Sequence, residues 1–172
     1  QRLFLMTGYP VMLNLTGKAV VVVGGGKIAA RKITRLIEAD AVVTVISPKV
    51  TLSIKHYVQD NQVRWLKQPY SLNTLSHCYP VLVFAAADSE QINRQIAADS
   101  RRIGAWVNVL SESGESDFHN VAVIEQAPLT IGISTNGTSP ALLKMIKARI
   151  EQAIGEHFNL LSEWLGEIRS DV

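Results

Sequence analysis

The sequence of 172 residues predicts an α/β protein with a parallel sheet, followed by a small α+β region and a helical C-terminal segment. Three observations predict this class. Short apolar runs alternate with amphipathic stretches as far as residue 110, a glycine-rich turn follows the first run, and the alternation ends at the polar stretch 111–117. Strands joined by helical crossovers produce such an alternation, with helices on both faces of a parallel sheet.

The first half of the alternation contains two strands and two helices. Residues 19–23 form a continuous β-branched run, which is typical of a strand buried on both faces. Apolar residues then recur at helical spacing over residues 27–39. A second buried strand is expected at 42–46, stopped by Ser47 and Pro48, and residues 49–60 are expected to be helical.

Three further strands complete the predicted sheet, at residues 63–66, 81–86 and 105–110. Between the last two, Asp88 and Gln91 have the spacing of a capping box, in which an acidic or hydroxyl side chain caps a helix start. We therefore expect a helix from Asp88 to about Ile103.

The pattern changes after the polar stretch. Two strands are expected at 121–125 and 129–134, then a sharp turn, and then Ser139 as an N-cap before a helix whose first residue is Pro140. A last helix at about 156–168 carries enough large apolar residues to need a partner. The predicted organisation is a parallel-sheet domain over 1–111, a small α+β region over 112–140 and a helical segment over 141–172.

Composition and charge narrow the possible functions. The net charge of +2 argues against a nucleic-acid binder, and no apolar run is long enough to span a membrane. The single cysteine, Cys78, cannot form an internal disulfide, and the opening does not resemble a secretory signal, so we expect a cytoplasmic protein. Basic residues are concentrated in the first third of the chain, either as scattered surface charge or as a cleft for an anionic ligand.

The stretch VVVVGGGKIAARK, residues 20–32, joins the first strand to the first helix. Gly24, Gly26 and Ala29 satisfy the Gly-x-Gly-x-x-Ala pattern of a dinucleotide site, in which glycines allow a pyrophosphate to approach the helix N-terminus. The structural alternative is a turn that needs glycine only for its positive φ. The glycine stretch lies between a predicted strand and a predicted helix, and this position favours the dinucleotide site and a Rossmann-type sheet.

The second strand is followed by the residues expected at the adenosine ribose. NAD sites usually place an acid there, whereas this sequence has Ser47, Pro48 and Lys49. Ser47 has a hydroxyl for the ribose, and Lys49 has a charge that suits a 2′-phosphate. The residues therefore leave the choice between NAD and NADP open.

Several separated motifs resemble one family. These are Tyr9-Pro10, the glycine stretch, FAAAD at 84–88, VNV at 107–109, DF at 117–118 and IGISTNGTSP at 131–140. Together they resemble, in order, the precorrin-2 dehydrogenase/sirohydrochlorin ferrochelatase family, which also forms the N-terminal module of some siroheme synthases. The resemblance extends from about residue 9 to 155. It implies a homodimer that oxidises precorrin-2 to sirohydrochlorin with NAD in siroheme biosynthesis, and in some members inserts ferrous iron.

The resemblance also implies the site residues, at the carboxyl ends of the strands. The residues expected to bind NAD are Gly24, Gly25, Gly26, Lys27, Ile28, Ser47, Pro48, Lys49, Ala86, Asp88 and Asn108. Since the tetrapyrrole substrate is rich in carboxylates, we expect polar and basic residues to bind it, namely Ser134, Thr135, Asn136 and Lys144. Structural alternatives exist for three residues, because Asp88 and Ser139 sit at capping positions and Lys27 is also compatible with a solvated helix face.

One departure from the family concerns the catalytic group. The family commonly has an aspartate after its Val-Asn-Val segment, with a role in proton removal and metal insertion, and this sequence has Ser111 there. The nearby carboxylates Glu115 and Asp117 are the alternative catalytic candidates. Asp117 is equally compatible with stabilising its loop, and Glu115 with a solvated surface position. No set of metal ligands is predicted, so the metal site is unknown.

Two alternative functions remain open, and the serine at 111 favours the first of them and weakens the second. A non-catalytic descendant would bind NAD, tetrapyrrole or metal without turnover. A bifunctional enzyme would also insert ferrous iron into sirohydrochlorin. Oxidation of precorrin-2 depends mainly on cofactor placement, and it is the function that the motifs favour.

Overall fold

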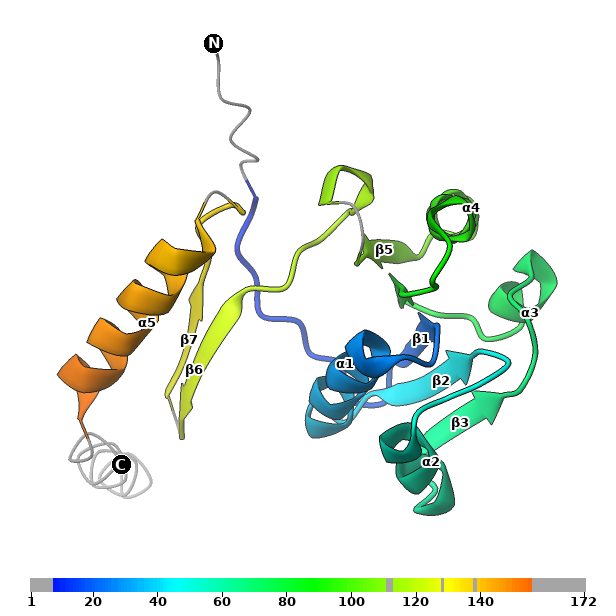
Figure 1. The fold of residues 1–172 in the computed structure, drawn as a ribbon, viewed down its shortest axis with the longest axis horizontal. Helices are drawn as coiled ribbons and strands as arrows, with labels where there is room; N and C mark the ends of the chain where they lie inside the picture. The colour runs from blue at the N-terminus through cyan, green and yellow to red at the C-terminus, as the bar shows by residue number, and fades with distance from the viewer. Residues whose placement is uncertain (1–7, 111–112, 128, 138, 156–172) are drawn as a thin grey trace, which may run out of the picture. The chain divides into compact units, whose positions relative to one another are not determined.

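The computed structural model describes residues 8–110, 113–127, 129–137 and 139–155. They divide into two compact units. The first is Val11–His119, and the second comprises residues 8–10 and 120–155 among those described. In Figure 1 the first unit runs from blue to green, and the strands and helix of the second are yellow to orange.

The first unit is built on a five-stranded parallel sheet in the order β3-β2-β1-β4-β5. The strands are β1 (Ala19–Val23), β2 (Val42–Ile46), β3 (Val63–Leu66), β4 (Leu82–Ala85) and β5 (Trp106–Val109). The bounds predicted for β1, β2 and β3 are confirmed, and β4 and β5 are one residue shorter at each end than predicted. The chain changes direction across the sheet between β1 and β4, which is where ligands of such sheets bind.

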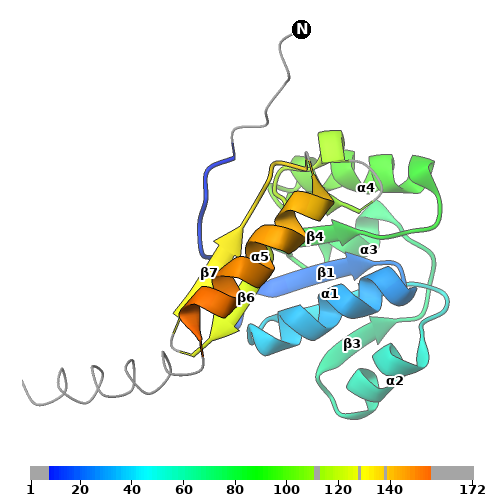
Figure 2. The same cartoon turned by 60° about the vertical axis from the view of Figure 1, so that its left-hand side comes forward.

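Helices cover both faces of this sheet, as Figure 2 shows. They are α1 (Lys27–Glu38) and α2 (Leu52–Gln59) on one face, and α3 (Leu72–Ser76) and α4 (Glu90–Arg102) on the other. Val20 and Val22 face α1 and α2, whereas Val21 and Val23 face α3 and α4. Because successive side chains of a strand point to opposite faces, the unbroken valine run of β1 supplies both cores.

A buried polar contact links the two helices of the second face. The hydroxyl of Tyr70, just before α3, donates to a carboxylate oxygen of Asp99 in α4 at 2.9 Å, and Asp99 is 3% exposed. Burial and this hydrogen bond raise the pKa of Tyr70. A buried carboxylate is costly unless it is paired, so the Tyr70 hydroxyl offsets the burial of Asp99.

Further local predictions differ from the structure. The helix predicted over 49–60 is shorter and begins at Leu52, as α2. Helix α3 was not predicted, because its five residues are too few to show a helical period. The capping box at Asp88 is wrong by one residue. Ser89 is the N-cap, its backbone is extended, and its Oγ accepts from the amide of Ile92. Both backbone groups of Ala87 are hydrogen-bonded to the Asn93 side chain, which fixes the chain just before this cap.

The outer edge of β5 is closed by side chains instead of a further strand. Beyond β5 a short 3₁₀ turn, Ser113–Glu115, leads to Ser116 and Asp117. The amide of Val107 donates to Asp117 Oδ2 at 2.9 Å, and the amide of Val109 donates to Ser116 Oγ at 2.8 Å. The backbone of Asp117 donates in turn to the carbonyl of Val107. An exposed strand edge presents unpaired donors, and these contacts satisfy them.

Arg101 holds this closing segment against α4. Its Nε donates to Asp117 Oδ1 at 3.0 Å, and one of its terminal nitrogens donates to the carbonyl of Glu115 at 2.7 Å. The hydrogen bond to Asp117 raises the pKa of Arg101. Asp117 therefore has both carboxylate oxygens engaged, one on β5 and one on α4.

The second unit contains a two-stranded antiparallel sheet and one helix. These are β6 (Ala122–Gln126), β7 (Leu129–Ile133) and α5 (Pro140–Ile154). Ser139 Oγ accepts from the amide of Leu142, which confirms the predicted cap, and Pro140 is the first helical residue as predicted. The helix predicted at 156–168 lies outside the described residues.

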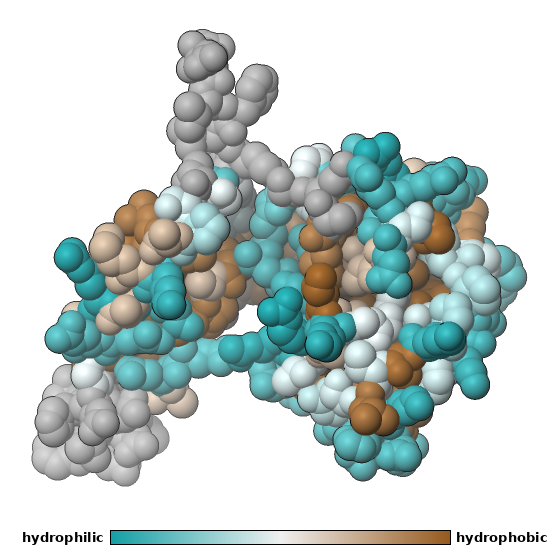
Figure 3. Space-filling model, viewed as in Figure 1, coloured by the Kyte–Doolittle hydropathy of each residue, from teal (hydrophilic) through white to brown (hydrophobic). Residues whose placement is uncertain are grey.

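Few side chains of this second unit are buried among the described residues. Ile124 is 4% exposed, whereas α5 contains no buried residue, and Leu142 and Met145 are 41% and 48% exposed. Figure 3 shows apolar residues, in brown, on the surface of this unit. Separately, none of the helices in the described part of the chain is long and apolar enough to cross a membrane.

The edge closure at β5 gives a stability prediction. Replacing Asp117 with Ala removes the acceptor of the buried Val107 amide and the partner of Arg101, so we expect a loss of about 1–3 kcal/mol in unfolding free energy. The measurement is urea unfolding followed by circular dichroism. Glu38→Gln is the control, because the Arg35–Glu38 pair is exposed and is worth at most about 0.5 kcal/mol. Equal, small losses in both variants would contradict the closure.

Candidate functional site

The glycine turn after β1 brings three connecting loops into backbone contact. Gly24 has a φ of 122°, which side chains rarely permit, and a Cβ on it would collide with the carbonyl of Ala86 after β4. A Cβ on Gly25 would collide with the carbonyl of Lys49 after β2. These two glycines are therefore required by packing, because the loops that follow β2 and β4 lie directly against them.

Gly26 differs from the other two glycines. Its φ is −80°, and a Cβ built on it would meet no atom within 4 Å. It is the N-cap of α1 and provides no capping side chain. The space in front of it is open, so its backbone is accessible to a ligand.

The first turn of α1 presents its amides to the same open space. The first helical hydrogen bond is donated by Ala30 to the carbonyl of Gly26, so the amides of Lys27, Ile28 and Ala29 precede the helical ladder. No acidic residue occupies this turn, and Ala29 is buried against the sheet. Amides at the positive end of a helix bind phosphate groups, and this turn fits a pyrophosphate.

The loop after β2 follows a fixed path beside the glycine turn. Ser47 is 8% exposed, and its Oγ donates to the carbonyl of Lys49 at 2.7 Å. Its own carbonyl accepts from the indole of Trp65 at 2.9 Å. The amide of Thr51 donates to the carbonyl of Gly25, and the backbone of Lys49 lies directly against Gly25.

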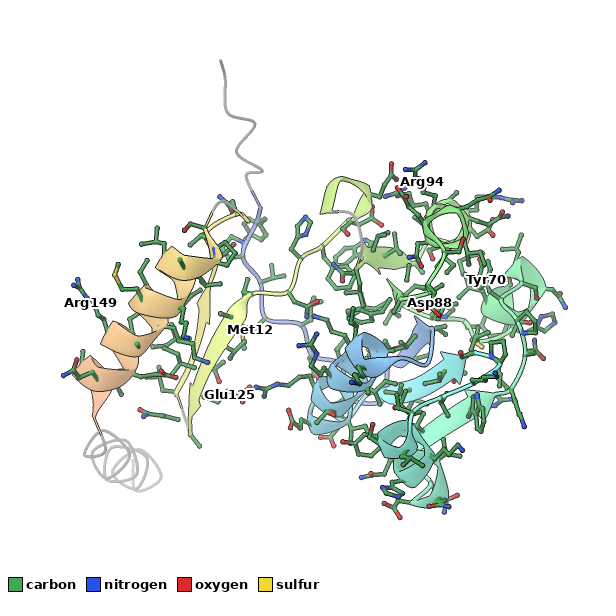
Figure 4. All side chains as sticks on the ribbon, in the orientation of Figure 1. Met12, Tyr70, Asp88, Arg94, Glu125 and Arg149 are labelled. Carbon is green, nitrogen blue, oxygen red and sulfur yellow. The ribbon has the colours of Figure 1, made fainter. Side chains whose placement is uncertain are left out.

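The loop after β4 lies on the other side of β1. The amide of Ala86 donates to the carbonyl of Val23, and Ala86 therefore continues the pairing with β1. Asp88 is exposed on the connection to α4 (Figure 4). Asn93, which is 2% exposed, holds the Ala87 peptide through both its amide and its carbonyl. Sequence reasoning missed Asn93, although an asparagine on the apolar side of a helix was a usable signal.

Asn108 lies near the carboxyl end of β5 with an unsatisfied oxygen. Its Nδ2 donates to the carbonyl of Phe118 at 2.7 Å, and the Phe118 ring packs edge-on against Phe84. Its Oδ1 is buried and has no hydrogen-bond partner in the described part of the chain. Buried polar atoms are normally satisfied, so this oxygen fits an additional donor such as a ligand amide or hydroxyl.

The three catalytic candidates are differently placed. Ser111 lies outside the described residues. Glu115 and Asp117 both contact Arg101, with a 3.5 Å ion pair in the case of Glu115. Asp117 accepts a hydrogen bond from the amide of Val107, near the amino end of β5. Ligands of such sheets bind at the carboxyl ends of the strands, so this contact lies away from the ligand edge.

The substrate candidates belong to the second unit. Asn136 and Gly137 both have positive φ and form the predicted turn, and the amide of Asn136 donates to Ser134 Oγ. Lys144 is exposed on α5. A hollow of about 150 Å³ lies beside this turn, lined by Asn120, Val121, Ala122, Ile133, Ser134, Thr135, Gly137, Pro140 and Leu143.

The fold and the glycine turn define a Rossmann-type dinucleotide-binding protein. The chain belongs to the family described as putative NAD(P)-binding, whose model matches residues 11–122. A second family model, described as sirohaem biosynthesis protein central, matches residues 126–153. These matches confirm the resemblance that the sequence motifs indicated.

Relatives and one solved structure agree with this assignment. Siroheme synthase of Psychrobacter arcticus is 32% identical over 167 residues, which are 97% of this chain and 30% of that protein. Siroheme synthase of Hydrogenovibrio crunogenus is 31% identical over 95% of this chain and 35% of its own length. The chain therefore spans about a third of these curated relatives. The structure of SirC, a precorrin-2 dehydrogenase, is 28% identical with a TM-score of 0.79, covering 95% of this chain and 79% of that one.

Unfolding free energies can distinguish Gly24, which packing requires, from Gly26, which faces open space. We expect Gly24→Ala to lower the unfolding free energy by about 1–3 kcal/mol, since it adds both backbone strain and a collision with Ala86. Gly26→Ala is the matched control and is expected to change it by at most about 0.5 kcal/mol. Urea unfolding measures both. A loss at Gly26 as large as at Gly24 would show that the space before α1 is not open.

Proposed function

We propose that this chain oxidises precorrin-2 to sirohydrochlorin in siroheme biosynthesis, with NAD as the hydride acceptor. The observation that carries the proposal is the likeness to the precorrin-2 dehydrogenase SirC over 95% of the chain. The open glycine turn supports it independently, because that turn fits the pyrophosphate of a dinucleotide.

The cofactor contacts that we propose follow the carboxyl edge of the sheet. The amides from Gly24 to Ile28 would bind the pyrophosphate, and Ser47, Pro48 and Lys49 would border the adenosine ribose. Ala86, Asp88 and Asn108 would border the nicotinamide end, where the free Oδ1 of Asn108 is an acceptor for the carboxamide or a ribose hydroxyl. NAD supplies the hydride acceptor, and these residues orient it.

The substrate contacts that we propose lie in the second unit. Ser134 and Thr135 line its hollow, and Asn136 and Lys144 add an amide and a positive charge. Hydroxyl, amide and ammonium donors suit a substrate rich in carboxylates, because charge-assisted hydrogen bonds are the stronger ones.

For removal of the substrate proton, the contacts of Glu115 and Asp117 favour an indirect role. We propose that Asp117 and Glu115 act as positioning residues, because Arg101 engages both and Asp117 also pairs with β5. Ser111 follows Leu110 in the sequence, and we retain it as the candidate that contacts substrate. This assignment selects loop stabilisation, one of the two interpretations of Asp117 that the sequence allowed.

We further propose that the protein is a cytoplasmic homodimer that pairs through residues 112–140 and the helical segment 141–172. The scarcity of buried side chains among the described residues of the second unit supports a partner of the same chain. Ferrous iron would be a substrate of a second activity, which the name siroheme synthase of the relatives suggests. No cluster of metal-ligating side chains occurs among the described residues.

Anaerobic incubation with precorrin-2 and NAD tests the proposed oxidation. We expect NADH and the sirohydrochlorin spectrum to appear together in equal amounts. In Gly26→Ala the added methyl group obstructs the pyrophosphate, so we expect at least about tenfold weaker NAD binding and a matching loss of turnover at low NAD.

Three results would contradict the proposal or limit it. A folded protein that binds NAD and precorrin-2 without forming NADH would be a non-catalytic binding module. Unchanged NAD binding in Gly26→Ala would remove the glycine turn from the site. Iron insertion into supplied sirohydrochlorin above the protein-free rate would add the second activity.

A further inference from the structure

Asn93 is a buried polar residue of α4 to which the proposed reaction gives no role so far. Its side chain is 2% exposed, and it is the fourth residue of the helix. Its Oδ1 accepts from the amide of Ala87 at 2.9 Å, and its Nδ2 donates to the carbonyl of the same residue at 3.0 Å. A side-chain amide has a donor and an acceptor side by side, so Asn93 pairs with Ala87 as the backbone of a neighbouring strand would.

The peptide that joins Ala86 to Ala87 is held from two sides. A Cβ built on Gly24 would collide with the carbonyl of Ala86 and would lie 3.2 Å from the amide nitrogen of Ala87, so this peptide lies directly on the glycine turn. In a trans peptide the C=O and N–H bonds point in opposite directions. The carbonyl of this peptide faces Gly24 and its N–H faces Asn93, so the two contacts together fix its position.

Helix α4 is a rigid support for this contact. Ile96 and Ala97 are fully buried in the core that α4 shares with α3, and Asn93 lies about one turn before them. The phosphate turn depends on a different helix, because Ala29 and Ile33 of α1 are buried in the core on the other face of the sheet. The loop after β4 and the turn before α1 are therefore supported from opposite faces.

We propose that Asn93 is a positioning residue of the cofactor site. By holding the Ala87 peptide it fixes the loop that would border the nicotinamide end, whereas the first turn of α1 would hold the pyrophosphate. The proposal rests on the cofactor site of the proposed function, and it assigns the orientation of the hydride acceptor to a residue that acts through Ala87. Misplacement of a reacting group by about 1 Å costs about a hundredfold in rate, so a small shift of this loop is sufficient.

Asn93→Leu is the test variant, because leucine has a similar shape and supplies neither hydrogen bond. Ser100→Ala is the matched control. Ser100 is fully buried in the same helix, and its Oγ donates to the carbonyl of Ile96 within that helix. Urea unfolding of the full chain establishes that each variant is folded under the assay conditions.

Titrations with NADH and with ADP distinguish the two ends of the site without precorrin-2. ADP has the adenosine and both phosphates but lacks the nicotinamide, whereas the fluorescence of NADH reports the reduced nicotinamide ring. In Asn93→Leu we expect NADH to bind at least about tenfold more weakly and ADP to change by less than about threefold. The emission of bound NADH should also move toward that of the free coenzyme. Ser100→Ala should change neither ligand.

Turnover of precorrin-2 gives a second readout of the same displacement. At saturating NAD we expect kcat to fall about 10- to 100-fold in Asn93→Leu, with a change of less than about threefold in the KM for precorrin-2. A purely structural defect would lower the active fraction, which unfolding measures, and would leave the emission of the bound NADH unchanged.

Asn93→Asp is the second variant, and it tests the proposal even if Asn93→Leu does not fold. A carboxyl group can accept from the Ala87 amide in either protonation state, but only its protonated form can also donate to the Ala87 carbonyl. Burial disfavours the charged form, so the ratio of NADH to ADP affinity should recover as the pH is lowered. The charged neighbours Asp88, Glu90 and Arg94 are exposed, and Glu90 pairs with Arg94.

The opposite outcomes overturn separate claims. Equal losses of NADH and ADP binding in Asn93→Leu, or the same losses in Ser100→Ala, would make Asn93 a structural residue only. Unchanged NADH binding and turnover would show that the loop keeps its position without Asn93. An unaltered protein that binds NADH but leaves precorrin-2 unoxidised would overturn the proposed reaction, and the two titrations would still decide the role of Asn93. Failure to bind either ligand would overturn the cofactor site itself.

Discussion

The close approach of three loops to Gly24 and Gly25 is the constraint on which the rest of the site depends. The loops after β2 and β4 meet these glycines through carbonyl groups, so a single methyl group at either position would separate them. That packing leaves Gly26 and the first turn of α1 uncovered at the switch point of the sheet. The phosphate site that we propose would thus be a consequence of backbone packing, with the amides of a helix N-terminus as its donors.

Side chains from separate parts of the sequence fix the loops that meet at the glycine turn. Trp65 and Ser47 hold the loop after β2, and Asn93 holds the peptide of Ala87 after β4. At the outer edge Arg101 and Asp117 do the same for the segment beyond β5, and Phe118 in that segment anchors Asn108. These contacts use buried or half-buried polar groups, which are costly when unpaired and therefore specify one arrangement. A site that binds a cofactor without rearrangement requires such support.

The two units contribute different chemistry to the proposed reaction. The first has a core on each face of its sheet, and the first turn of α1 presents backbone amides. The second presents hydroxyl and amide groups around a small hollow, and its helix has no buried residue among those described. A dinucleotide and a carboxylate-rich macrocycle are both anions, so the polar donors on each unit suit the proposed reaction.

The sequence by itself determined the features that depend on local pattern. The valine run predicted the bounds of β1, the glycines predicted the turn between β1 and α1, and Ser139 with Pro140 predicted the start of α5. Each of these is encoded within a few residues, because strand burial, helix capping and glycine φ are local properties.

Only the tertiary structure decided features that join distant residues. Ser89 caps α4 in place of Asp88 because Asn93 holds Ala87, and Gly25 is required because Lys49 lies against it. Asp117 closes β5 only because Arg101 and Val107 are neighbours in space. Spacing in a sequence does not state which loop will pack on which strand end, since that choice depends on the order of strands in the completed sheet.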